Sequence, residues 1–332
     1  MASWFSRTGL VAGGGGARAQ RVVEAVDSVL RGIGQVMLQD NAYTGLLFVV
    51  AICCNAPLHG LAAVIGAAVG TAVAGLAGAD RALIRQGHFG FNGALVAIAL
   101  PIFISPGLLL WSCVVLAAGG STVIFAALTA LLAPWRMPGL TAPFVLTTWC
   151  LVLAAAGLAR LEPTGLAPAA AFPEWAPGAG GASLAALADG VLNGIGQVFL
   201  QENRLTGLVF ALGLLVASRP AFVAALAGAL AGGLVAWGMG APEAAIRAGL
   251  FGFNPVLVAI ATGAALPAWN RATCVVAALA VIATPVVQAA TTAALAPIGL
   301  PALTFPFVFV TWLVLFAGRG FASLAAPGAG DG

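Results

Sequence analysis

The sequence contains very little charge. Only 7% of its 332 residues are Asp, Glu, Lys or Arg, and because lysine is absent, all thirteen basic residues are arginines. A soluble domain has about a quarter of its residues charged, so a chain that is 61% hydrophobic, with a mean hydropathy of +1.07, cannot cover its surface with polar groups. This composition excludes a soluble enzyme and, being so apolar, a disordered chain. The net charge of +3 is too small for a nucleic-acid-binding protein.

Residue pairs typical of redox or metal sites are also missing. Two histidines, His59 and His88, have no partner at matching positions elsewhere in the chain, and we interpret them as loop or capping residues. The cysteines lie in apolar runs without CxxC spacing, so we predict small hydrophobic residues within helices; they are Cys53, Cys54, Cys113, Cys150 and Cys274. We expect no cofactor and no metal.

Long stretches without any charged residue are present instead. A helix that spans a bilayer needs about 20 apolar residues, and the charge-free stretches are 41–79, 86–135, 137–159, 205–218, 220–242, 248–270 and 272–318. The first can hold two helices split near residues 55–57, and the second can hold two split near residues 101–106. The sequence therefore predicts an all-α polytopic membrane protein embedded in a lipid bilayer.

The chain contains an internal duplication. GIGQVMLQDNAYTGLLF at 32–48 matches GIGQVFLQENRLTGLVF at 194–210, and MPGLTAPFVLTTW at 137–149 matches LPALTFPFVFVTW at 300–312. A third block, which begins Gly90-Phe91-Asn92, matches the block at 252–261. The offset between the copies is 162 or 163 residues throughout. We predict a cytoplasmic arm, two repeat halves separated by a Pro/Gly/Ala linker, and a tail, at 1–19, 20–160, 161–181, 182–319 and 320–332.

The number of membrane spans per half decides whether the second half is inverted. The distribution of arginines gives ten inside and three outside with either five or six spans, and therefore does not decide the number of spans. Six spans would require 107–134 and 272–296 to be split into pieces of about 12–14 residues, or about 20 Å, which is shorter than the roughly 30 Å hydrocarbon core. We therefore predict five spans per half, two inverted repeats and a cytoplasmic N-terminus.

Each half also has features of broken helices. Gly32 and Gly34 precede Gln35, and the same pattern precedes Gln197; we predict a re-entrant segment whose freed backbone carbonyls line a cavity. Prolines at 138 and 143 flank Thr141, and prolines at 301 and 306 flank Thr304, so we predict helix interruptions there too.

The candidate site residues are the polar residues that occur in both copies, because duplicated transporters place their site between the repeats. They form the pairs Gln35 and Gln197, Asn92 and Asn254, and Thr141 and Thr304. Such residues also serve as ordinary hydrogen-bonding groups between or within helices. An uncharged lining rich in acceptors suits a small neutral solute with N–H donors. Flat apolar walls, unless they are ordinary core packing, would come from Phe91, Leu95, Phe253 and Leu257.

The run Leu300-Pro301-Ala302-Leu303-Thr304-Phe305-Pro306-Phe307 resembles the LPxxTxPF signature of urea transporters, and the first copy departs only in Met137. The resemblance implies passive urea permeation, with urea as the partner, by a homotrimer with one pore per protomer, and two inverted halves that each have five spanning helices and one re-entrant half-helix. It places Thr141 and Thr304 at the constriction. The oxygen-lined path would include Gln35 and Gln197 with the backbone of Val36 and Val198, and the slots would be formed by Phe91, Leu95, Phe253 and Leu257. Location would be the bacterial inner membrane.

Two departures from the family pattern bear on affinity and selectivity. Gln197 stands where some bacterial members carry Glu, and Leu38 stands where a Phe is common.

The sequence is also compatible with other functions. They include a channel for short amides, ammonia or water, and an ion-coupled transporter that uses the repeated pair Asp27 and Asp189. The segment Asn254-Pro255-Val256 resembles the Asn-Pro-Ala motif of water and glycerol channels, but the first copy reads Asn92-Gly93-Ala94. An ammonium channel would need paired pore histidines, and nothing favours a purely structural scaffold.

Overall fold

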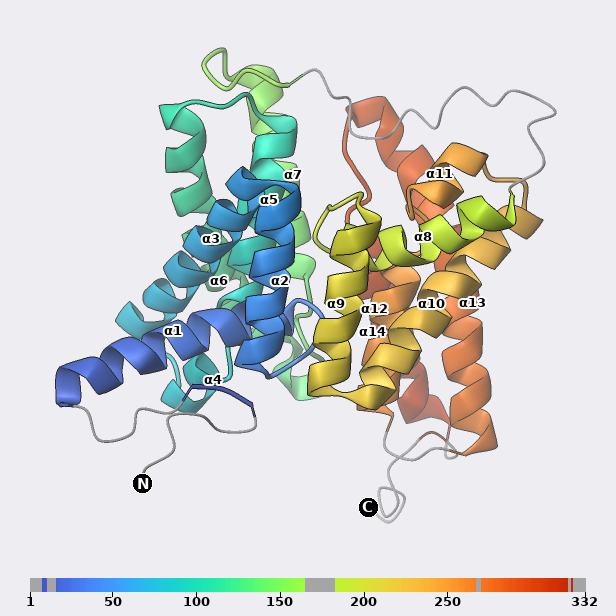
Figure 1. Ribbon diagram of the computed structural model, residues 1–332, viewed down its shortest axis with the longest axis horizontal. Coiled ribbons are helices and arrows are strands. Elements are labelled where there is room, and N and C mark those ends of the chain that lie inside the picture. The colour runs from blue at the N-terminus through green and yellow to red at the C-terminus, as the bar shows by residue number, and fades with distance from the viewer. Residues whose placement is uncertain (1–7, 11–15, 165–182, 267–269, 322–323, 325–332) are drawn as a thin grey trace. The chain divides into compact units, whose positions relative to one another are not determined.

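The computed structural model describes residues 8–10, 16–164, 183–266, 270–321 and 324 (Figure 1). Within these residues the chain forms fourteen α-helices and two short 3₁₀ helices. They form no β-strand, and one isolated bridge joins Ile104 to Pro163. The prediction of an all-α protein is confirmed. The arm at 1–7, most of the linker and most of the tail lie outside the described residues.

The helices of the first half are separated by turns at the predicted positions. They are α1 (Ala17–Gln35), α2 (Ala42–Asn55), α3 (Pro57–Leu76), α4 (Arg81–Arg85), α5 (Phe91–Phe103), α6 (Leu108–Leu132), η1 (Ala133–Trp135) and α7 (Ala142–Gly157). The predicted splits near 55–57 and 101–106 are confirmed. Pro57 begins α3, where its missing N–H costs nothing, and Asn41 caps α2 by accepting from the backbone N–H groups of Tyr43 and Thr44.

The second half repeats the same order of elements. It contains α8 (Leu184–Gln197), α9 (Arg204–Ala217), α10 (Arg219–Gly238), α11 (Glu243–Arg247), α12 (Phe253–Ala265), α13 (Arg271–Leu295), η2 (Ala296–Ile298) and α14 (Phe305–Gly320). The offset from α2 to α9 is 162 residues, and the offset from α7 to α14 is 163, as in the sequence blocks.

Four helical segments are long and apolar enough to cross a membrane: Pro57–Leu76, Leu108–Trp135, Arg219–Gly238 and Arg271–Ile298. The unbroken 25-residue helices α6 and α13 confirm that these segments are not split in two. The other apolar helices have 13–16 residues, or about 20–24 Å. The count of five spanning helices per half stays a prediction.

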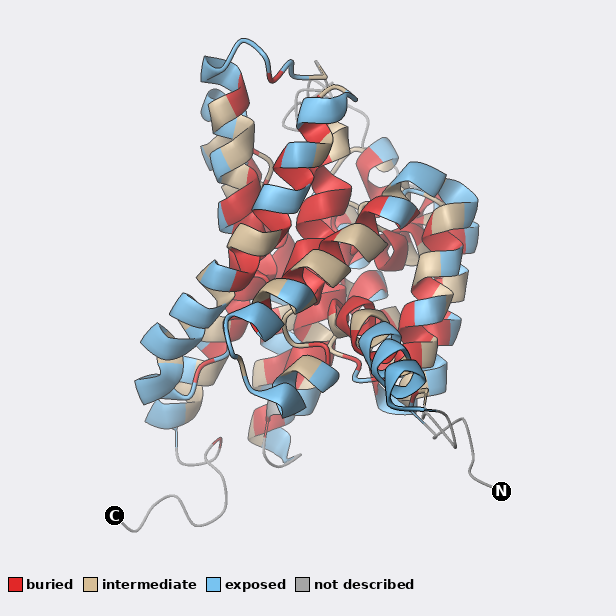
Figure 2. Cartoon of the chain, turned by 90° about the vertical axis from the view of Figure 1, so that its left-hand side faces the viewer, coloured by how far each residue is buried: buried red, intermediate tan, exposed pale blue. Residues whose placement is uncertain are grey.

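The long helices expose large apolar side chains along their outer faces. Leu116 on α6 is 73% exposed and Leu279 on α13 is 60% exposed. Exposed residues follow one another down the helices in Figure 2. Apolar patches of this extent are rare on the surface of a monomeric soluble protein. Together with the four long apolar segments, they identify a multi-pass membrane protein.

Two compact units group the helices. One contains Met1–Ala167 and Leu212–Ser218, and the other contains Pro168–Ala211 and Arg219–Gly332. In the first unit, α5 is the innermost helix and packs against α1, α3, α6 and α7. In the second, α12 packs in the same way against α8, α10, α13 and α14. An almost uninterrupted apolar sequence suits both helices because they are buried on all sides.

The cysteines and histidines lie in helices or turns. All five cysteines are free thiols and lie within helices, as predicted. His88 lies in the turn between α4 and α5. His59 lies in the first turn of α3.

Candidate functional site

The two repeated glutamines each end a helix and present a fixed amide. Nε2 of Gln35 donates to the carbonyl oxygen of Gln86 (2.9 Å), and Nε2 of Gln197 donates to the carbonyl oxygen of Ala248 (3.0 Å). A carbonyl oxygen only accepts, so the amide nitrogen must face it. In each half the side-chain oxygen Oε1 is therefore turned away from this bond and has the chemistry of a hydrogen-bond acceptor.

The backbone after each glutamine adds further acceptors. The carbonyl oxygens of Val36 and Val198 receive no hydrogen bond from any described residue, as is usual at the end of a broken helix. The next carbonyls are occupied, because Nε2 of Gln39 donates to Met37 (2.8 Å) and Nε2 of Gln201 donates to Phe199 (3.0 Å). The predicted break after each glutamine is present. Gln39 and Gln201, which hold its shape, were missed although both repeats contain them.

Four leucines mark strained turns at matching positions of the two halves. Leu38 and Leu200 have φ angles of 62° and 55°, and Leu140 and Leu303 have 49° and 48°. The left-handed region costs a residue with a Cβ about 1–2 kcal/mol. The first two lie in the turns after the glutamines, and the last two directly precede Thr141 and Thr304. Strain of this kind concentrates at functional sites.

Asn92 connects α5 to the start of α7. Its Nδ2 donates to the carbonyl oxygen of Leu140 (3.3 Å), and its Oδ1 accepts from the backbone N–H of Phe144 (3.1 Å). These two bonds bracket Thr141, which occupies the N-cap position of α7 without a capping bond from its side chain. The buried asparagine is therefore an interhelical tether, the alternative to a pore-lining role for this pair.

Asn254 makes the same connection in the second half. Its Nδ2 donates to Leu303 (3.1 Å), and its Oδ1 accepts from the N–H of Phe307 (3.1 Å). Thr304 is at the N-cap position of α14 between these two bonds. In both halves the N-termini of two short apolar helices consequently meet beside a threonine.

Glycines bring the glutamine helix onto the same turn. A Cβ atom built on Gly87 would lie 2.3 Å from the backbone nitrogen of Gly32, and one on Gly249 would lie 2.2 Å from that of Gly194. Only glycine allows backbones to approach this closely. Each half thus brings its glutamine to one turn, at residues 86–91 and 248–253. The phenylalanine ends this turn, and the asparagine after it bonds to the residue before the threonine.

The apolar candidates are largely buried within their units. Phe91 is 8% exposed and Phe253 is 9% exposed, whereas Leu95 and Leu257 have no exposed surface. Phe91 is oriented at 83° to the ring of Phe125, at a centroid distance of 5.4 Å. An edge-to-face pair of this type fixes the ring plane.

The repeated aspartates are engaged in ion pairs. Asp27 accepts from Arg31 (2.6 Å) and from the backbone N–H of Leu10 (2.6 Å). Asp189 accepts from Arg204 (2.9 Å) and Arg247 (2.8 Å). The hydrogen bond from Arg204, followed by that from Arg247, holds the pKa of the Asp189 carboxyl below its ordinary value of 3.8. A carboxylate that stays ionised at neutral pH is a poor proton carrier, so these contacts favour a structural role.

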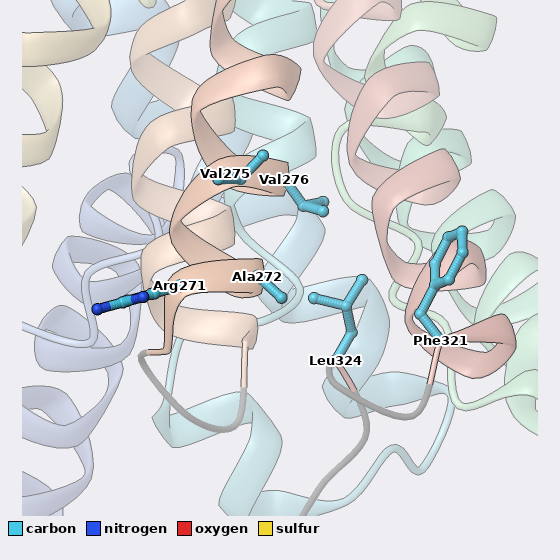
Figure 3. A pocket seen from close by; sticks show the side chains of 6 residues that line it. All are labelled: Arg271, Ala272, Val275, Val276, Phe321 and Leu324. Carbon is cyan, nitrogen blue, oxygen red and sulfur yellow. The ribbon is translucent and has the colours of Figure 1, made fainter.

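A hollow of about 380 Å³ lies away from these turns, at the start of α13 (Figure 3). No candidate site residue borders it. Its walls are formed by Arg271, Ala272, Val275, Val276, Phe321 and Leu324.

Comparison with known proteins identifies the family of the chain. A family model described as "UT: Urea transporter" matches residues 26–319, a range that contains every candidate residue. Urea transporter 1 of Ovis aries is 31% identical over 305 residues, covering 89% of this chain and 77% of the relative. Urea transporter 1 of Capra hircus has the same identity and coverage, and that of Rattus norvegicus is 29% identical over 300 residues with the same coverage.

Proposed function

The chain belongs to the urea transporter family, and we propose that it moves urea passively down its gradient through an oxygen-lined pore. The family is one of transport proteins, so no residue is assigned a catalytic role. The observation that carries the proposal is the repeated set of uncharged acceptors in each half, namely a glutamine Oε1, a valine carbonyl and a threonine at one turn.

Hydrogen-bonding chemistry explains why urea suits this lining. Urea is neutral and planar, and its N–H donors lose water when it enters a narrow path. Desolvation of an amide-like group costs about 2–7 kcal/mol unless new bonds replace those to water. Gln35, Thr141, Gln197 and Thr304 would supply successive acceptors, with Val36 and Val198 adding their backbone oxygens.

The shape of the solute would be matched by the apolar candidates. We propose that Phe91 and Leu95 form one flat slot and that Phe253 and Leu257 form the other. Leu38 would border the path where the family often has a larger aromatic side chain.

Electrostatics support a neutral rather than a cationic solute. No ionisable residue is among the candidates, so no counter-charge would balance a guanidinium or ammonium ion. Each threonine also lies where two helix N-termini meet, and helix N-termini carry a partial positive charge that disfavours cations.

The wider arrangement is proposed from the resemblance and from the arginine distribution. We propose inverted halves, each with five spanning helices and one re-entrant half-helix, in a homotrimer with one pore per protomer. The protein would lie in a bacterial inner membrane with its N-terminus in the cytoplasm.

Urea flux into proteoliposomes tests the proposal. We expect urea permeability well above that of empty liposomes, unchanged when a protonophore and a sodium ionophore collapse ion gradients. Thiourea and short amides should compete with urea, whereas guanidinium should not. Uptake that disappears with the ionophores would favour ion coupling, and guanidinium permeation equal to that of urea would contradict the neutral lining.

A further inference from the structure

The two halves differ at one position beside the asparagine tether. Helices α6 and α13 begin and end 163 residues apart. Phe125 of α6 and Gln288 of α13 are therefore equivalent positions of the two repeats. Phe125 packs edge-on against Phe91, and its ring lies 3.4 Å from the position of a Cβ built on Gly139. Gln288 is instead a buried polar residue whose Oε1 accepts from Nδ2 of Asn254.

The orientation of this glutamine follows from its neighbours. Leu303 offers a carbonyl to Asn254 and Phe307 offers an N–H, so Nδ2 and Oδ1 of Asn254 are each assigned by a backbone partner. The second N–H of Nδ2 then requires an acceptor, and the atom of Gln288 that faces it must be the oxygen. In the first half, the corresponding N–H of Asn92 has no such partner among the described side chains, because Phe125 replaces the glutamine.

We propose that Gln288 is a positioning residue for Thr304, acting through Asn254. With three bonds on its amide, Asn254 is held in one orientation, and it in turn holds Leu303 and Phe307 on the two sides of Thr304. Asn92 has two such bonds, so the turn that carries Thr141 is less tightly constrained. This inference rests on the proposed function, in which both threonines contact urea.

Hydrogen–deuterium exchange of the full-length protein in nanodiscs tests the tether directly. The backbone N–H of Phe307 and that of Phe144 make the same bond to an asparagine, so they form an internal comparison. A membrane-buried interhelical hydrogen bond has a modest worth, and we expect Phe307 to exchange about threefold to tenfold more slowly than Phe144. Equal exchange of the two amides in the wild-type protein would overturn the proposal without any variant.

Three variants extend the test. Gln288→Met keeps the length of the side chain without the acceptor and should abolish the slow exchange of Phe307, whereas Gln288→Glu keeps an oxygen and should preserve it. Phe125→Met, the matched control, should leave Phe307 unchanged. Unchanged exchange in Gln288→Met would contradict the proposal.

Urea permeability separates positioning from simple structural support. We expect about a threefold lower permeability in Gln288→Met and near wild-type permeability in Gln288→Glu. Faster exchange with unchanged permeability in Gln288→Met would overturn the positioning role. A wild-type protein that conducts no urea would refute the proposed function, while the exchange comparison would still decide the tether.

Discussion

Asn92 and Thr141 are coupled through the backbone, because the side chain of Asn92 bonds to the residue before Thr141 and to the amide of Phe144 after it. These bonds join the first turns of α5 and α7, two helices separated in sequence by the whole of α6. The same coupling between Asn254 and Thr304 recurs in the second half. In each half the position of the threonine thus depends on the buried side-chain amide of an asparagine from another helix.

Replacement of this amide should weaken both folding and transport. In Asn92→Ala, the N–H of Phe144 and the carbonyl of Leu140 lose their partner in a buried site, which costs about 1–3 kcal/mol. We expect a lower thermal midpoint and lower urea flux. Ser112→Ala on α6 is the control, because the exposed Ser112 hydroxyl donates only within its own helix, to the carbonyl of Leu108; equal losses in the two variants would contradict the tether.

The glutamine at the end of α1 should control flux through its side-chain oxygen Oε1. Gln35→Met removes the acceptor at nearly constant volume, and loss of one hydrogen bond of about 1 kcal/mol predicts about a fivefold lower urea permeability. Gln20→Met on the same helix is the control, since Gln20 is exposed and its side-chain amide donates to Glu24. Similar permeability in the two variants would remove Gln35 from the path.

Close backbone contacts predict which glycines tolerate alanine. A Cβ on Gly45 would lie 1.8 Å from the carbonyl oxygen of Leu30, and one on Gly207 would lie 1.9 Å from that of Leu192. Each alanine substitution should cost more than about 2 kcal/mol because a backbone must move. Gly75→Ala, which meets nothing within 4 Å, should be neutral or stabilising by up to about 1 kcal/mol; thermal unfolding in detergent measures the difference.

The pKa of Asp189 predicts a pH dependence of stability, and no pH dependence of transport near neutrality. Because the bonds from Arg204 and then Arg247 lower this pKa, the ion pairs contribute stability above the ordinary carboxyl value and lose it as the pH falls through the folded-state pKa. Asp189→Asn should therefore lower the thermal midpoint at pH 7, with a smaller difference below about pH 4.

Urea flux at two pH values tests whether transport is independent of pH near neutrality. Wild-type flux should be equal at pH 6 and pH 8, since Asp189 stays ionised across this window. A flux that changes severalfold between these values would support coupling through a carboxylate.

The sequence was sufficient wherever a residue type has one strong local effect. Pro57 and the segment around Pro101 marked the ends of helices, and the glycines before Gln35 marked the helix break that follows it. Segment length correctly predicted that α6 and α13 are unbroken, because half of either segment would be too short to cross a bilayer.

Tertiary partners decided what local patterns could not. Nothing about leucine predicts the left-handed turns at Leu38 and Leu303, since that conformation is unfavourable for it and is imposed by the bonds around it. Asn92 was recognised as repeated, but its tethering role depends on Leu140 and Phe144, about 50 positions away. The shortness of α5 and α7 was equally hidden, because a charge-free stretch does not encode where a helix begins.

The central claim is that hydroxyls at the two helix starts contact urea, and Thr304→Val compared with Thr311→Val tests it most directly. Both changes remove one hydroxyl from the start or interior of α14, and the Thr311 hydroxyl is buried without a hydrogen-bond partner among the described residues. We predict that Thr304→Val lowers urea permeability in proteoliposomes about tenfold, whereas Thr311→Val retains the wild-type value. Equal permeability of Thr304→Val and wild type, in vesicles that hold equal amounts of folded protein, would contradict the account.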